Sequence, residues 1–343
     1  MAEPGMAPID KARFALRRET GDLPEAAAKL AEEIGSTAVE AVVAQANRTA
    51  VRRGATAALG SMSPRPAEWY AFDDGDQETT DWYPQGLTGS EDSGSIGVPV
   101  FMVSWYFKPA AGERGIRITF LSPRTLRYRH ALLVAARPDG GYGPIDIHAG
   151  GIACFGDLLY VADTVRGLRV FDLGNLLDLR TAQNDLGDPE RVGRHGGKFH
   201  AFGYRYIIPQ TDHWQVAAAG PRFSFVGLDR TGDTPLLITG EYREGDPLGW
   251  VGRWPLDLAG GEPADAFTMG RPKIQGALSQ GDTWYLSQAG PSSTTNGKLV
   301  VHSGEESRTR PFPIGPEDLT VQGGKLWSVT EFKNKRTVFG VAL

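Results

Sequence analysis

Three segments of the chain repeat one pattern, at residues 150–164, 275–288 and 317–332. Each has a short apolar strand, a turn that contains glycine, and a second strand that ends in a polar residue. Self-similar units built from short strands are typical of β-propellers, in which small antiparallel sheets are arranged around a central axis. The repeat therefore predicts an all-β fold.

The repeat also predicts the number of units. Each unit opens on a short pair of residues, and these are Gly86-Leu87, Gly151-Ile152, Gly227-Leu228, Gly276-Ala277 and Asp318-Leu319. The last unit has only three strands before Leu343, so a strand near 68–72 would have to complete it and remove the open edges. We therefore predict a five-bladed propeller over residues 65–343. Six blades remain an alternative, because residues 181–222 are long enough to contain further strands.

Residues 1–60 differ from the rest, being rich in Ala, Glu and Arg with helical periodicity. They predict an α-helical extension that packs against the propeller, mediates dimerisation or recruits a partner. The sequence has no apolar run of the length that a signal peptide or a membrane span needs, so it predicts a cytoplasmic protein without a membrane partner. A secreted location is expected only if a leader segment precedes this sequence.

The net charge of −5, without a basic cluster, argues against a nucleic-acid partner.

The ends of the predicted strands carry polar residues that suggest a site. In a propeller, the starts of the first strands and the ends of the second strands meet at one mouth of the central channel. The candidates at strand starts are Gln85, His148, Gln275, Glu317 and Asp318, and those at or just after strand ends are Asp163, Arg166, Glu241, Arg243, Gln288 and Glu331. The segment 209–215 is read as a loop over this mouth, which adds Gln210, His213 and Trp214 as binding candidates. The alternative is that these groups only satisfy one another in a water-filled channel.

His148 is the first candidate for catalysis, because imidazole titrates near neutral pH. Asp163, Glu317, Glu241 and Glu331 are the candidate carboxylates, and a nearby carboxylate would orient His148 and raise its pKa. A structural histidine is the alternative. No cofactor is predicted. The oxygens of Glu241, Glu317, Asp318 and Glu331 would nevertheless suit Ca²⁺, which prefers oxygen ligands, so a calcium site stays open.

Several phrases resemble a family of actinomycete propeller proteins that are described only as secreted or hypothetical. They are YPQGLT (83–88), HAGGIA (148–153), YIIPQ (206–210), KIQGALS (273–279) and the segment 315–332. The resemblance covers roughly residues 80–343 and implies a propeller fold without naming an activity. The phrase YVADTVRGLRVFDL (160–173) is more loosely similar to propellers of the strictosidine-synthase and NHL type, whose functions are unrelated.

These observations predict an enzyme that acts on a small molecule by general acid/base chemistry at the channel mouth. The reaction would be that of a lyase, isomerase, cyclase or hydrolase, in actinomycete specialised metabolism. Two alternatives stay open. The first is a non-catalytic propeller that binds a glycan or a peptide, and the second is a scaffold that docks a partner through the helical extension.

Overall fold

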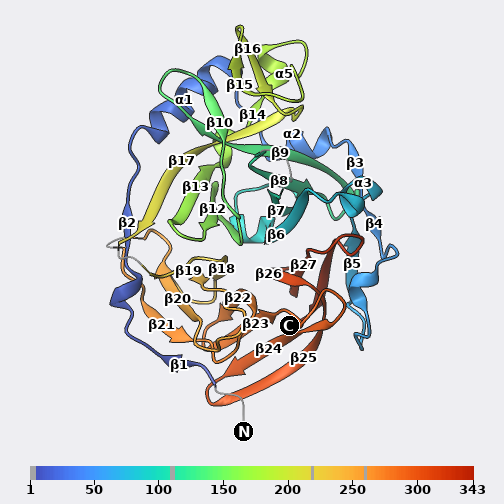
Figure 1. The fold of residues 1–343 in the computed structure, drawn as a ribbon, viewed down its shortest axis with the longest axis vertical. Helices are drawn as coiled ribbons and strands as arrows, with labels where there is room; N and C mark the ends of the chain where they lie inside the picture. Colours follow the sequence, from blue (N-terminus) through green and yellow to red (C-terminus); the bar gives the residue numbers. More distant parts are fainter. Residues whose placement is uncertain (1–4, 109–112, 218–219, 259–260) are drawn as a thin grey trace.

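The structure is a computed structural model that describes residues 5–108, 113–217, 220–258 and 261–343. Most of its regular structure is β-strand, and the helices are short (Figure 1). This confirms the all-β class. Residues 1–4 of the predicted extension lie outside the described residues.

Antiparallel runs of consecutive strands form the body of the molecule. The first run is β6 (Trp82–Gly89), β7 (Phe101–Phe107), β8 (Ile116–Leu121) and β9 (Arg127–Ala136). The second begins with β11 (Ile152–Phe155), β12 (Leu158–Asp163) and β13 (Gly167–Asp172). Then follow β18 (Phe225–Asp229), β19 (Leu236–Gly240), β20 (Trp250–Pro255) and β21 (Asp265–Thr268). The last two runs are β22 (Ile274–Gln280), β23 (Thr283–Gln288), β24 (Asn296–Ser303) and β25 (Glu306–Ile314), and β26 (Pro316–Gln322), β27 (Lys325–Thr330) and β28 (Thr337–Ala342).

The glycines of the repeated phrases form the turns between the first and second strands. Gly156, Gly281 and Gly323 have φ values of 56°, 62° and 59°. Tight hairpin turns need this left-handed conformation, which glycine adopts without steric cost. The glycine turn in the sequence pattern is therefore a backbone requirement.

The strand β17 (Tyr206–Val216) pairs along its length with two long strands, β9 and β13, and corrects one sequence interpretation. Residues 206–209 pair in parallel with β9, and residues 210–215 pair antiparallel with β13 as the outer strand of the second run. The sequence analysis read residues 209–215 as a loop, whereas they belong to this strand. Pro209 has no amide hydrogen to donate to a ladder, and it stands where the partner changes.

The strand β5 (Glu68–Ala71) pairs antiparallel with β28, with Ala71 opposite Thr337 and Glu68 opposite Gly340. The sequence predicted that a strand near 68–72 would complete the last unit, and β5 lies at these residues. Strands from distant parts of the chain thus complete one sheet.

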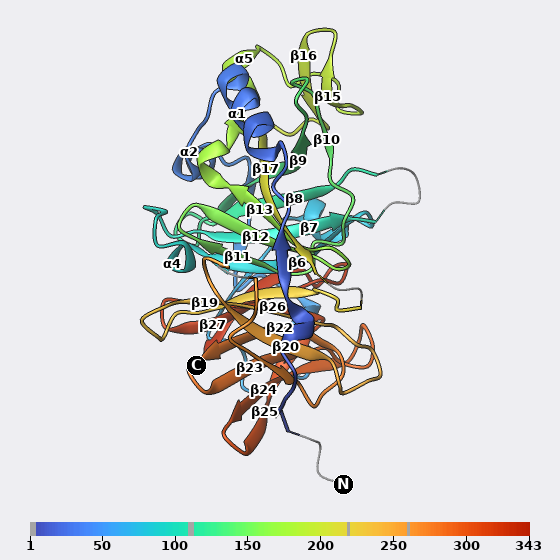
Figure 2. The ribbon, with the colours of Figure 1, turned by 90° about the vertical axis from the view of Figure 1, so that its left-hand side faces the viewer.

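The first sixty residues do not form only helices. They contain α1 (Leu23–Ile34) and α2 (Val39–Ala44), but also the short strands β1 (Ala7–Pro8), β2 (Leu16–Arg18), β3 (Arg48–Thr49) and β4 (Val51–Arg52). These strands pair with β21, β17, β9 and β5 respectively. The segment therefore runs along the outside of the molecule and pairs with outer strands whose edges would otherwise be open (Figures 1 and 2).

The stretch 181–222, in which further strands were considered, contains the hairpin of β15 (Val192–His195) and β16 (Lys198–Ala201) before β17. This hairpin forms a separate two-stranded sheet. The remaining short elements are α3 (Asp74–Glu78), α4 (Ser90–Ser93), β10 (Tyr142–Pro144), β14 (Leu177–Asp178), α5 (Leu179–Ala182) and the 3-10 turns Ala12–Phe14, Ala57–Leu59 and Leu173–Asn175.

The first strands of the runs, β6, β11, β18, β22 and β26, contact one another in a closed order. Most of these strands lie near the middle of the view in Figure 1. A methyl group on Gly151 would lie 2.2 Å from the amide nitrogen of Val226, and one on Gly276 would lie 2.7 Å from Cα of Asp318. The opening glycines thus let neighbouring backbones approach each other closely.

Asp318 replaces the glycine in the last run. Its Oδ2 accepts hydrogen bonds from the backbone amides of Ile152 at 2.9 Å and Leu87 at 3.2 Å. The carboxylate therefore links β26 to β11 and β6. This explains why an aspartate can stand at a position that is otherwise glycine.

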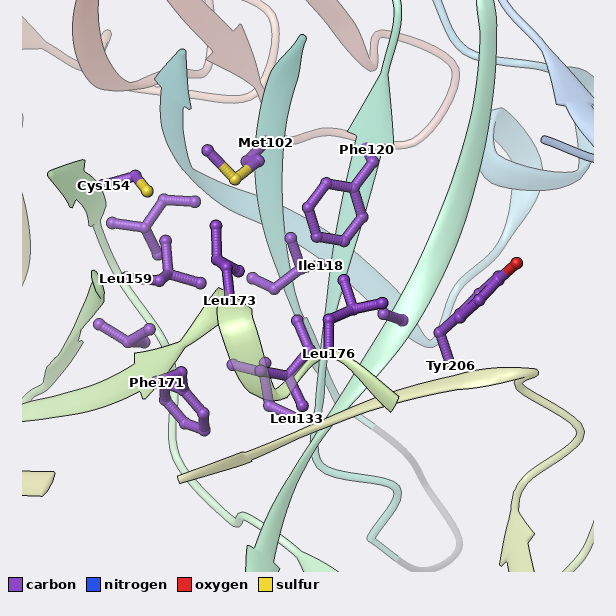
Figure 3. Packing of buried hydrophobic residues seen from close by; sticks show 14 of the residues in the cluster. Met102, Ile118, Phe120, Leu133, Cys154, Leu159, Phe171, Leu173, Leu176 and Tyr206 are labelled. Carbon is purple, nitrogen blue, oxygen red and sulfur yellow. The ribbon is translucent and has the colours of Figure 1, made fainter. Parts of the chain in front are cut away.

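Apolar side chains fill the space between neighbouring sheets. Figure 3 shows the cluster between the first two runs, which includes Met102, Phe120, Leu159 and Phe171. Cys154 is buried in it, and burial raises the pKa of its thiol. The thiol is thus part of the core.

Candidate functional site

A cavity of about 1130 Å³ lies where the first strands begin and the second strands end. Its wall is rich in ionisable side chains of both signs. The lining residues are Gln85, Tyr106, Lys108, Asp146, Ile147, His148, Asp163, Thr164, Val165, Arg166, Arg222, Ser224, Glu241, Tyr242, Arg243, Glu244, Asp246, Gln275 and Glu331.

Many of the candidates from the sequence meet in this cavity. Those that line it are Gln85, His148, Asp163, Arg166, Glu241, Arg243, Gln275 and Glu331. They come from every run of strands, because equivalent ends of the repeated strands face the same side of the molecule. The repeat therefore brings together residues that are far apart in the sequence.

Three other candidates lie near the cavity without lining it. Glu317 is buried behind the wall, where Nε2 of Gln275 donates a hydrogen bond to its Oε1 at 3.1 Å. The amide of Gln288 donates to the carbonyl of Pro272 at 3.0 Å. Asp318 binds the two backbone amides described above. These groups shape the wall but do not contact its open space.

The candidates in the supposed loop lie elsewhere. Gln210, His213 and Trp214 are on β17, the outer strand that pairs with β13, and none of them lines the cavity. Gln210 accepts a hydrogen bond from Arg169 at 2.7 Å, and the ring of Trp214 packs against an apolar cluster. The expectation that this segment covers the mouth is wrong, because its residues are part of the sheet.

Glu331 and Glu317 form a pair of poorly solvated carboxyl groups. Nε2 of Gln85 donates to Oε2 of Glu331 at 3.2 Å. Burial raises the pKa of Glu331 to about 7, although Gln85 and Lys108 oppose this effect. Burial and the negative charge of Glu331 raise the pKa of Glu317 well above its usual range. With a pKa of about 7, Glu331 is therefore present in both forms at neutral pH.

His148 does not have the environment that was expected. Its ring lies against that of Tyr106, with the centroids 4.0 Å apart and the planes tilted by 38°, and in the described part of the chain no carboxylate forms an ion pair with it. Partial burial and the charges of Lys108 and Arg222 lower the pKa of His148. Its imidazole is therefore neutral at neutral pH. The next residue, Ala149, has a left-handed φ of 47°, which is unusual for a residue with a Cβ.

Two other predicted carboxylates are bound by arginines. Asp163 accepts from Nε of Arg169 at 2.9 Å, and Glu241 accepts from Nε of Arg243 at 2.7 Å. Arg243 also pairs with Asp246. These carboxylates hold the wall in place through charge-assisted hydrogen bonds, which are stronger than neutral ones.

Sequence reasoning missed several residues of the wall, among them Tyr106, Lys108, Arg222 and Tyr242. Lys108 follows the end of its second strand as Arg166 does, three residues after Trp105 and Asp163 respectively. It was overlooked because the first unit ends this strand on an aromatic residue. Burial raises the pKa of Tyr106, with contributions from Glu331 and Glu317, and burial raises that of Tyr242 to about 12.

Within the described residues, no group of three or more His, Cys, Asp or Glu residues is arranged to hold a metal ion. The four oxygen-bearing residues considered for Ca²⁺ thus do not form such a group there. A search for helices that could cross a membrane found none of sufficient length and apolarity among these residues.

Comparisons with protein-family models and with curated proteins found no match for this chain. The cavity therefore has to be interpreted from its own geometry.

Proposed function

We propose that the chain is a five-bladed propeller enzyme that acts on a small molecule in this cavity by general acid/base chemistry. The closed order of β6, β11, β18, β22 and β26 supports the blade count, with β17 and β5 completing two of the blades. The reaction class remains that of a lyase, isomerase, cyclase or hydrolase, all of which need proton transfer.

The observation that carries this proposal is Glu331, a carboxyl group on the cavity wall with a pKa of about 7. A general acid or base works best when its pKa lies near the working pH, because both protonation states are then available. Ionised Glu331 would remove a proton from the substrate, and protonated Glu331 would return one. Gln85 is the positioning residue, since its amide binds Oε2 of this carboxylate.

His148 is the second proton-transfer group of the proposal. Its lowered pKa keeps the imidazole neutral, so the ring can accept a proton at one nitrogen and donate from the other. Behind Gln275, burial and the charge of Glu331 raise the pKa of Glu317, which disfavours a second negative charge beside Glu331. A substrate placed between Glu331 and His148 would thus meet two groups able to exchange protons.

The first experiment compares wild-type protein with Glu331→Gln on a mixed small-molecule extract, followed by untargeted mass spectrometry. We expect features that the wild type converts, with rates about 10²-fold to 10⁴-fold lower for the variant. Glu244→Gln is the matched control, because Glu244 is an exposed carboxylate on the same wall. Equal conversion by wild type and Glu331→Gln would contradict the assignment of Glu331.

A non-catalytic binding propeller is the second candidate function. The side-chain amides of Gln85 and Gln275 and the rings of Tyr106 and Tyr242 line the same wall, and amides beside aromatic rings suit a sugar. This candidate predicts compounds that bind to both wild type and Glu331→Gln and that neither protein converts.

A further inference from the structure

The cavity has an uneven distribution of charge. Lys108 follows β7, Arg166 follows β12 and Arg222 precedes β18, so these three cations come from neighbouring parts of the wall. Glu331 and Gln275, with Glu317 behind it, come from the later strands. We call the part of the wall with Lys108, Arg166 and Arg222 the cationic side; Gln85, Asp146 and Asp163 come from the same early runs of strands.

Among the described residues, none of the three cations forms an ion pair with a carboxylate, and all three are exposed. The ammonium Nζ of Lys108 lies 5.9 Å from the ring centroid of Tyr83. The nearby Asp163 is bound by Arg169. Asp146 also lines the cavity, and it interacts with Glu113: burial and the negative charge of Asp146 raise the pKa of Glu113. The cationic side thus keeps its positive charge.

Two of the cations, Lys108 and Arg222, act on one part of the cavity. Lys108 and Arg222 both lower the pKa of His148, so their fields overlap at its imidazole. Lys108 also lowers the pKa of Glu331, which lines the same cavity. A bound group between these cations would therefore lie close to both His148 and Glu331.

We propose that the substrate carries an anionic group, a carboxylate or a phosphate, and that Lys108, Arg166 and Arg222 bind it. This inference rests on the proposed function and names the substrate class. Guanidinium groups bind two oxygens of such an anion at once, and unpaired cations in a concave site concentrate anions there. The neutral ring of His148 adds a hydrogen-bond donor. The rest of the substrate would then extend toward Glu331.

Isothermal titration calorimetry with two probes, inorganic phosphate and citrate, tests this inference at constant ionic strength. We expect saturable binding of at least one probe to wild-type protein. Binding of phosphate alone assigns a phosphate group, and binding of citrate alone assigns a carboxylate. Saturable binding of both supports the shared anion chemistry. Binding of neither probe would overturn the inference.

The binding should depend on these residues and not on the net charge of the protein. The triple variant Lys108→Gln, Arg166→Gln, Arg222→Gln should weaken binding at least tenfold. The control triple variant Arg124→Gln, Lys298→Gln, Arg308→Gln makes the same change in net charge at exposed positions outside the cavity. Equal weakening in both would overturn the inference. If the first triple variant does not fold, its three single substitutions replace it and should each weaken binding.

Glu331→Gln separates this inference from the proposed function. The variant should bind the probes at least as tightly as the wild type, because it removes a negative charge from the same cavity. Anion binding without any Glu331-dependent conversion would contradict the proposed catalysis and leave the anion site in place. Glu331-dependent conversion of substrates without an anionic group would overturn the anion site alone.

Discussion

Two carboxyl groups of this molecule, the buried Asp76 and the half-buried Glu331, have opposite electrostatics. Asp76, on α3, accepts hydrogen bonds from Nη2 of Arg117 at 2.6 Å and from the hydroxyl of Tyr128 at 2.7 Å, and it lies 3.0 Å from Nε2 of His130. Glu331 instead has one amide donor, from Gln85, and faces the cavity. The two regions differ in how completely their carboxyl groups are bound.

The difference appears in the pKa values. Burial opposes ionisation of Asp76, but His130 and Arg117 hold its pKa well below the usual range. Burial and Arg117 in turn lower the pKa of His130 to about 4. The guanidinium of Arg117 also lies 4.6 Å from the ring centroids of Trp82 and of Trp105.

Burial of a carboxyl group therefore does not by itself mark a catalytic residue. Asp76 has its charge fully compensated, so it stabilises the fold and holds no exchangeable proton near neutral pH. Glu331 is incompletely compensated, so it can exchange a proton. Incomplete compensation costs stability, which is common where a site has a chemical function.

The substitution Asp76→Asn should cause the largest change in the free energy of unfolding. The substitution leaves the buried charge of Arg117 without its partner, which typically costs about 3–5 kcal/mol. Urea denaturation at pH 7 measures this loss. Asp74→Asn is the control, since Asp74 is exposed on the same helix and should change the free energy of unfolding by less than about 0.5 kcal/mol. Equal effects of the two substitutions would contradict the structural role of Asp76.

A smaller effect of opposite sign is expected for Glu331→Gln. The native pKa of about 7 exceeds the ordinary value of 4.5, so between these pH values the folded protein holds a proton that the unfolded chain releases. This group therefore lowers the free energy of unfolding as pH rises from 4.5 to 7. The variant should gain stability relative to wild type, on the order of 2 kcal/mol, between pH 5 and pH 8.

Urea denaturation of both proteins at the two pH values measures this change. A difference between variant and wild type that is the same at pH 5 and pH 8 would show that Glu331 has an ordinary pKa. The contribution of Asp76 has the reverse sign, because its depressed pKa makes stability fall as pH decreases.

The smallest effect concerns Gln85→Met. The amide of Gln85 favours the ionised form of Glu331, so its removal should raise the pKa of Glu331 further above 7. Carboxyl chemical shifts of ¹³C-labelled glutamate, followed by NMR over a pH titration, measure this shift. Gln275→Met is the matched control, because this amide binds Glu317 instead. If the titration of Glu331 changed in Gln275→Met but not in Gln85→Met, Gln275 and not Gln85 would be the amide that binds Glu331.

The sequence predicted the features that depend on its repeat. Alternating apolar strands and glycine turns predicted the all-β class, and equivalent strand ends predicted that Gln85, Asp163 and Glu331 would lie near one another. Periodicity carries this information because it fixes which end and which face of each strand a residue occupies. The class of fold and much of the wall of the cavity were thus predictable.

Features that depend on contacts outside the repeat were not predictable. Asp76, Arg117 and His130 come from a short helix and two different strands, and no spacing in the sequence links them. The partner change in β17 was missed because an apolar run followed by polar residues resembles a strand followed by a loop. The pKa of His148 was expected to rise because a carboxylate neighbour was assumed. It is lowered instead, and the cations that contribute, Lys108 and Arg222, belong to other strands and loops that no spacing links to His148.

The pairing of β5 with β28 also affects how the chain reaches its folded state. Residues 68–71 emerge early in synthesis, whereas their partners at 337–340 emerge after nearly all other strands. Contacts between such distant segments have a high entropic cost and form slowly. Until they form, a nascent chain carries unpaired strand edges that can join those of another chain. The time between the synthesis of these two strands is therefore the period in which the protein is most exposed to aggregation.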